Sequence, residues 1–193
     1  MQFKKDNMLS NKEVGVMNIA RDKYINAFKK RAVNPSDFDA NIACLEDLAH
    51  ACNYWMAVAT PHMEKELHAE KKAEESHFSF FKDKAREEAL KEMLIIDSAK
   101  KLMLDGVETI IKEEFAKEPR IISLDYHENH KTTENKKGKV ISRTNKDVYT
   151  ITFSDKSTLI LQDLDPESLA QAKIQFNEKM DELAPKSNTP SFS

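Results

Sequence analysis

The chain has 193 residues, of which 40% are hydrophobic and 33% charged, and its formal net charge is −3. It contains only three glycines, which argues against all-β and α/β folds, because these need glycine at tight turns and ligand-binding loops. No run of about 18 apolar residues is present, so we expect no membrane-spanning segment. These values predict a soluble protein of long helices with solvated faces.

The two cysteines, Cys44 and Cys52, belong to one helical pattern, in which about 1.5 Å of rise per residue separates them by roughly 12 Å. That separation is too long for a disulfide. The first ten residues lack the apolar stretch of a signal peptide, so we expect a cytoplasmic protein with reduced thiols. Both cysteines lie on apolar helix faces, where burial keeps a thiol protonated, and neither is a candidate nucleophile.

The first predicted element is a helix that begins at Ser10, after a flexible segment over residues 1–9. Ser10-Asn11-Lys12-Glu13 has the spacing of a capping box, in which Ser10 and Glu13 exchange hydrogen bonds with each other's backbone. Asn34-Pro35 closes the segment. Its apolar residues recur at helical spacing: Val14, Met17, Ala20, Tyr24, Ala27 and Phe28.

The second predicted helix, residues 38–59, carries two adjacent apolar rows, a face too wide for a two-stranded seam. We therefore expect it to be the central helix of a bundle, with Leu45 and Leu48 buried. Ser36 or Asp37 is the expected N-cap, and Pro61 either ends or bends this helix or opens the next one. Trp55 interrupts the aliphatic rows and is interpreted as a core anchor, with an anchor for a partner as the alternative.

The third region runs from residue 62 to residue 118. Residues 62–75 are mostly charged and predict a solvent-exposed helix. An aromatic cluster follows these residues, and a further helix is expected to continue to about residue 105. Gly106 is expected to break or kink this helix. A last apolar stripe follows and ends at Pro119. The cluster consists of Phe78, Phe80 and Phe81.

After Pro119 the pattern changes to short β-branched runs separated by turn residues, which predicts four strands over residues 120–126, 139–144, 148–153 and 158–161. Asn145-Lys146-Asp147 is one of the expected hairpin turns. A C-terminal helix starts at Asp165-Pro166-Glu167 and covers the sheet with Leu169, Ile174, Phe176, Met180 and Leu183. The fold class is therefore α+β, with a helical bundle at 10–118, an antiparallel β-meander with a C-terminal helix at 119–184, and a flexible tail at 185–193.

Motifs for catalysis are absent from the sequence: it contains no glycine-rich phosphate loop, no nucleophile elbow and no zinc-protease motif. Asp47-x-x-His50 and Glu74-x-x-His77 have the spacing of di-metal carboxylate bundles, but acidic residues are so frequent that such pairs arise by chance. His127-Glu128-Asn129-His130 is interpreted as a polar loop. We therefore assign no catalytic residue, no metal ligand and no cofactor, and a metal-dependent enzyme on the helical bundle is only a third hypothesis.

Basic residues outnumber acidic ones over 1–34 and 120–146, and acidic residues dominate elsewhere. The two basic segments, residues 4–31 and 131–146, favour phosphate contact, so the alternative function is nucleic-acid binding, with Tyr126 and Tyr149 as stacking platforms. Cations at a helix C-terminus and on an edge loop also have structural roles. The candidate residues are Lys29, Lys30, Arg31, Lys136, Lys137, Lys139 and Arg143.

The leading hypothesis is a non-enzymatic interaction protein, a small regulator, inhibitor or accessory factor that binds a protein partner. It rests on the absence of catalytic motifs and on charged segments suited to steering association. Trp55, Phe78, Phe80 and Phe81 are the candidate partner-binding residues. We also expect self-association to a homo-oligomer, because the helices carry more apolar surface than they can bury among themselves.

Overall fold

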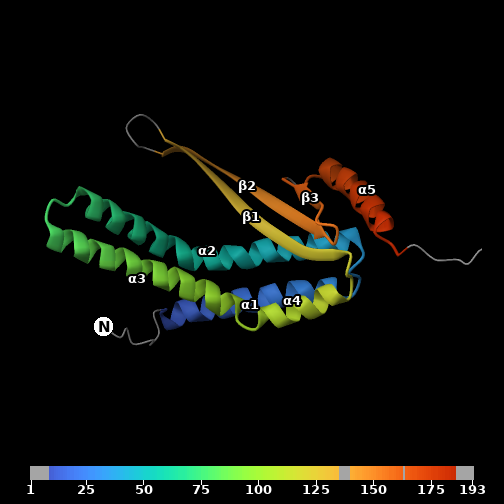
Figure 1. Cartoon of the computed structure of the whole chain (residues 1–193), viewed down its shortest axis with the longest axis horizontal. Helices are drawn as coiled ribbons and strands as arrows, with labels where there is room; N and C mark the ends of the chain where they lie inside the picture. The colour runs from blue at the N-terminus through green and yellow to red at the C-terminus, as the bar shows by residue number, and fades with distance from the viewer. Residues whose placement is uncertain (1–8, 135–139, 163, 186–193) are drawn as a thin grey trace, which may run out of the picture. The chain divides into compact units, whose positions relative to one another are not determined.

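A computed structural model describes residues 9–134, 140–162 and 164–185, with only the backbone described over 128–134 and 140–146 (Figure 1). The described part is mostly helical with one antiparallel sheet, which confirms the α+β class. The elements in chain order are α1 (Asn11–Arg31), α2 (Phe38–Glu75), α3 (Ser79–Leu104), α4 (Val107–Ala116), β1 (Ile121–Glu134), β2 (Val140–Phe153), β3 (Thr158–Leu161) and α5 (Pro166–Glu182).

Helix starts follow the predicted caps. At α1, the Ser10 backbone amide donates to Glu13 Oε2 at 2.7 Å and the Glu13 amide donates to Ser10 Oγ at 3.3 Å, so the capping box is confirmed. At α2, the Ala40 amide donates to Asp37 Oδ2 at 3.0 Å. Asp165 caps α5 by accepting from the amides of Glu167 and Ser168.

The prediction of four strands is wrong, because the described sheet has three strands in the order β1-β2-β3. The expected strands at 139–144 and 148–153 are one strand, β2, and Asn145-Lys146-Asp147 pairs with β1 instead of forming a turn. This segment lacks the glycine that favours a tight hairpin turn, and β1 offers it a partner along its whole length. The expected loop at His127–His130 likewise continues β1.

The expectation that Pro61 ends the second helix or opens a new one is wrong, whereas a bend at Pro61 stays a prediction. Helix α2 is assigned as one helix of 38 residues with Pro61 inside it. Residues on both sides of Pro61 are buried, among them Val58 and Ala69. Tertiary packing therefore outweighs the loss of one backbone hydrogen bond at the proline.

The chain divides into two compact units, residues 1–27 with 47–111 and residues 28–46 with 112–193. The expected domain boundary near residue 118 stays a prediction, although residues 28–46 are grouped with the sheet. In the first unit, Leu9 and side chains from α1, α2 and α3 form one apolar cluster: Leu9, Met17, Ala20, Val58, Ile95, Ala99 and Met103. Leu9 is thus packed, whereas the other residues of the expected flexible segment 1–9, and nearly all of 185–193, lie outside the described residues.

The second unit is built on the aromatic side chain of Phe176, which is fully buried. Its ring lies 5.5 Å from that of Phe38 and 5.9 Å from that of Phe153. Ala172, Phe176 and Met180 form the buried stripe of α5. Ile174, expected to cover the sheet, is 61% exposed, because it falls outside this i, i+4 stripe.

Candidate interaction surface

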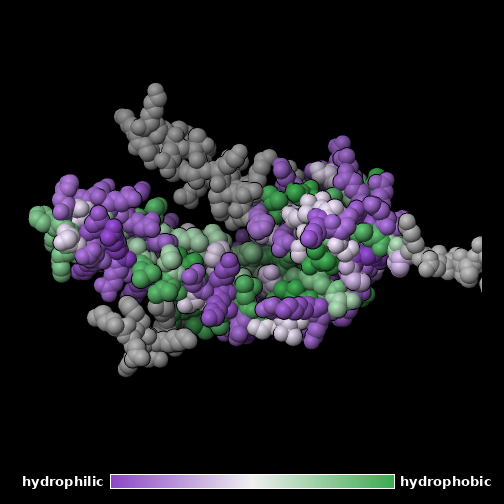
Figure 2. All heavy atoms as spheres, viewed as in Figure 1, coloured by the Kyte–Doolittle hydropathy of each residue, from purple (hydrophilic) through white to green (hydrophobic). Residues whose placement is uncertain are grey.

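The turn between α2 and α3 presents three phenylalanines to solvent, and we call Phe78, Phe80 and Phe81 the phenylalanine cluster. Their exposed fractions are 72%, 73% and 55%. The rings of Phe78 and Phe80 lie 6.3 and 5.7 Å from that of Phe81, in edge-to-face contacts. Figure 2 shows apolar atoms at this end of the helical hairpin. The structure thus brings together three of the four predicted partner-binding residues.

Local backbone geometry exposes the cluster. Helix α2 ends at Glu75, and Phe78 is the N-cap residue of α3 with an extended backbone and no side-chain capping bond. Phe80 and Phe81 lie in the first turn of α3, ahead of its first buried residue, Ala85. The three rings therefore contact one another and remain largely exposed instead of packing into the hydrophobic core.

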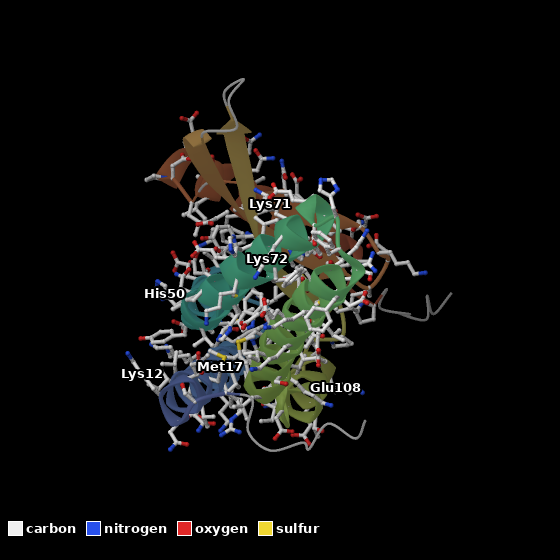
Figure 3. The ribbon with its side chains drawn as sticks, turned by 90° about the vertical axis from the view of Figure 1, so that its left-hand side faces the viewer. Lys12, Met17, His50, Lys71, Lys72 and Glu108 are labelled. Carbon is white, nitrogen blue, oxygen red and sulfur yellow. The ribbon has the colours of Figure 1, made fainter. Side chains whose placement is uncertain are left out.

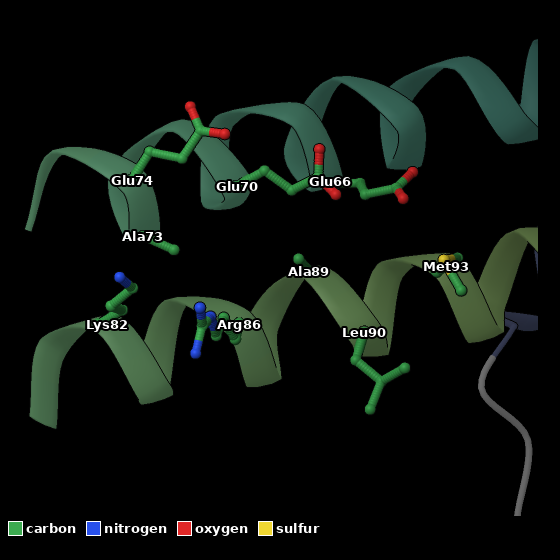
Figure 4. A pocket seen from close by; sticks show the side chains of 9 residues that line it. All are labelled: Glu66, Glu70, Ala73, Glu74, Lys82, Arg86, Ala89, Leu90 and Met93. Atoms are coloured by element: carbon green, nitrogen blue, oxygen red, sulfur yellow. The ribbon is translucent and has the colours of Figure 1, made fainter. Parts of the chain in front are cut away.

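Beside the cluster, α2 and α3 enclose an open groove of about 440 Å³ (Figure 4). Glutamates line its α2 wall and two cations line its α3 wall, with Ala73 and Ala89 between them. Neither wall forms an ion pair within the described part of the chain. The charged lining residues are Glu66, Glu70, Glu74, Lys82 and Arg86, and Leu90 and Met93 complete the lining.

Trp55, the fourth predicted partner-binding residue, is partly buried against the apolar cluster of the first unit. Its indole Nε1 has no hydrogen-bond acceptor among the described residues. This placement agrees with the core interpretation of Trp55 more than with a solvent-facing anchor.

The residues predicted to bind nucleic acid differ in their exposure to solvent. Lys29 and Lys30 are exposed at the end of α1, but Arg31 is 1% exposed, with Nε 2.6 Å from Asn41 Oδ1 and its guanidinium 4.7 Å from the Phe115 ring centroid. Burial lowers the pKa of Arg31 from its ordinary value. A side chain held in this way is not available to a phosphate.

The structure describes little of the other four basic candidates. Lys136, Lys137 and Lys139 lie outside the described residues, and Arg143 is described only by its backbone in β2. Of the two proposed stacking tyrosines, Tyr149 is buried, and burial raises the pKa of its phenol. Tyr126 donates to Asp147 Oδ1 at 2.9 Å.

A cluster that the sequence did not predict joins three helices of the first unit. His62, 7% exposed, lies between two carboxylates, with Nε2 2.9 Å from Glu13 Oε1 and Nδ1 2.5 Å from Glu92 Oε2. Burial opposes charging of His62, but the hydrogen bonds with Glu92 and Glu13 raise the pKa of the imidazole overall. The partners are far away in the sequence, so no local spacing could have indicated them.

Metal-binding candidates are not assembled in the described part of the chain, where no group of three or more His, Cys, Asp or Glu side chains is placed to hold a metal ion. His50, like Lys71 and Lys72 on the same helix, is solvent-exposed (Figure 3). Cys44 is buried and Cys52 half-buried, and no disulfide joins them.

Comparison with known proteins does not assign a family. No family model matches the chain, and neither a curated protein nor a solved structure matches it. Among the described residues, no helix is both long and apolar enough to cross a membrane.

Proposed function

We propose that this chain is a non-enzymatic interaction protein, a regulator, inhibitor or accessory factor, that binds a protein partner through the phenylalanine cluster. The observation that carries the proposal is the exposure of three contacting aromatic rings at one turn. Burying one fully exposed side chain of this size is worth about 1.5 to 3 kcal/mol, so a partner that covers all three gains at most about three times that amount, less the cost of association.

The position of the cluster suits binding. Its rings lie at the end of a helical hairpin whose alanines, Ala73, Ala85 and Ala89, are buried. Aromatic side chains also lose little conformational entropy when they become buried, and they are enriched among residues that dominate binding energy. The cluster therefore combines a large apolar area with attachment to regular secondary structure.

The test is affinity capture with the full chain, the triple variant Phe78→Ser/Phe80→Ser/Phe81→Ser, and a control variant, Ile174→Ser. Ile174 has a similar exposure, 61%, but lies on α5. We expect a protein retained by the wild type and the control to be lost by the triple variant, and the purified pair to show the same order in calorimetry. Equal capture by all three proteins would contradict the proposal.

Binding to mixed-sequence DNA and RNA at two salt concentrations tests the alternative function. A nucleic-acid complex whose affinity falls steeply with salt, and which the triple variant retains, would replace the proposed function. Circular dichroism of each variant checks that the helices are intact.

A further inference from the structure

We propose that the groove between α2 and α3 binds the same groove of a second copy, and that the resulting homodimer is parallel, with both phenylalanine clusters at one end. This goes beyond the proposed partner binding and does not depend on it. The proposal rests on the charges of the two walls, their register along the helices and the apolar surface beside them.

The walls carry complementary charges that are not satisfied within the described chain. Glu66, Glu70 and Glu74 follow one another at four-residue spacing on α2, where neighbouring like charges repel each other. Lys82 and Arg86 repeat the arrangement with positive charge on α3. None of these side chains has an ion-pair partner among the described residues, so the face is left with one negative and one positive wall.

The two walls are in register along the groove. Figure 4 shows the backbone of Glu74 opposite that of Lys82 and the backbone of Glu70 opposite that of Arg86, because the two helices run antiparallel from the turn between them, and the glutamate side chains extend along α2 away from the turn. Each cation is therefore attached opposite a glutamate of the other wall, and the flexible side chains of Glu70 and Glu74 can reach the cations of a second copy. The face is self-complementary only for arrangements that keep this register.

Symmetry then selects one arrangement. A two-fold axis along the groove places α2 of one copy over α3 of the other, so that the glutamates of each copy meet Lys82 and Arg86 of the other. A two-fold axis across the groove would instead place the two glutamate walls against each other, which is repulsive. The favoured axis leaves both hairpins pointing the same way.

Apolar surface along the same face supplies the area that such a contact needs. Leu90 and Met93, which line the groove, are 48% and 45% exposed, and Ala73 and Ala89 leave room for side chains of the second copy. A stable interface buries roughly 1,200 Å² or more, so the contact extends beyond the lining of the groove along α2 and α3. In the parallel dimer the two clusters lie at the same end and form one larger aromatic surface.

Charge exchange tests the proposal with two variants of the full chain, Glu70→Lys/Glu74→Lys and Lys82→Glu/Arg86→Glu. The first has two basic walls and the second has two acidic walls, so each repels its own copies, whereas the pair is complementary. By light scattering after size exclusion, we expect a dimeric wild type, a monomeric form of each variant alone, and a dimer in their equimolar mixture. Glu87→Lys/Glu178→Lys, reversed at exposed positions outside the groove, should remain dimeric.

Recovery in the mixture distinguishes loss of the interface from loss of folding, since an unfolded variant would not regain a dimer. A wild type that stays monomeric at all concentrations would overturn the proposal. Variants that dimerise alone, or a mixture that stays monomeric, would also overturn it.

Discussion

Two glycines, Gly106 and Gly15, should respond in opposite ways to replacement by alanine, because only Gly106 has a positive φ. Gly106 joins α3 to α4 with φ at +71°, a conformation that costs an L-residue about 1 kcal/mol, whereas Gly15 lies within α1 with open space around a Cβ position. We expect Gly106→Ala to lower the free energy of unfolding by about 1 kcal/mol and Gly15→Ala to raise it by about 0.5 to 1 kcal/mol. Chemical denaturation of the two variants measures both signs, and changes of the same sign would contradict this assignment.

The cluster of His62, Glu13 and Glu92 predicts a pH dependence of stability. The folded pKa of His62 is raised above 6.5, so its contribution is complete below that value and is lost as pH rises through the folded pKa. Hydrogen bonds from the Ser10 side chain, and then from His62, lower the pKa of Glu13 from 4.5 to about 2, so its contribution is present above 4.5 and is lost as pH falls toward 2. The cluster is therefore most stabilising between pH 4.5 and 6.5.

Thermal melting across this range tests the dependence. We expect the difference in melting temperature between the wild type and His62→Ala to be largest between pH 4.5 and 6.5 and to shrink as pH rises above the folded pKa of His62. A difference that grows between neutral and alkaline pH would contradict the charged state assigned to His62.

At the scale of elements, the buried face of α2 allows a prediction with a control on the same helix. Leu48 is 2% exposed and Leu67 is 53% exposed. Leu48→Ala should reduce the free energy of unfolding by about 2 to 5 kcal/mol, because it leaves a cavity, whereas Leu67→Ala should change it by about 0.5 kcal/mol or less. Equal effects in urea denaturation would show that this face of α2 is not packed as described.

Local patterns predicted some elements well and others poorly, for physical reasons. The capping residues Ser10, Asp37 and Asp165 were identifiable because a cap is a contact between neighbours in the sequence. The continuity of α2 through Pro61 and of β2 through residues 145–147 was not, because in each case packing or pairing with a distant segment overrides the local signal.

The same distinction applies to the candidate site. The phenylalanine cluster was visible as three aromatic residues between two charged helical segments, and the self-association that they suggested stays a prediction. Lys29, Lys30 and Arg31 looked alike in the sequence, but Arg31 is buried, and it donates a hydrogen bond to Asn41, ten residues later in the chain. A run of charges does not show which member turns inward.

At the scale of the whole molecule, the parallel dimer predicts which residues can be cross-linked. Ser79 and Lys100 are exposed near opposite ends of α3, separated by about 30 Å of helix. In a Cys52→Ala background, Ser79→Cys should cross-link to Ser79→Cys of a second copy through a short bismaleimide. A mixture of Ser79→Cys and Lys100→Cys proteins should give no cross-link between the two sites. An antiparallel dimer would instead cross-link position 79 to position 100 and would not cross-link two Ser79→Cys chains.

Photo-cross-linking in the source cells shows directly whether the phenylalanine cluster binds a protein partner. A benzoylphenylalanine is placed at position 80, or at position 174 as the control, since Phe80 and Ile174 are both largely exposed. We expect a discrete protein adduct at position 80, of a mass other than that of two copies of this chain, and none of that mass at position 174. The same adduct at both positions, or adducts at position 80 with nucleic acid alone, would contradict it.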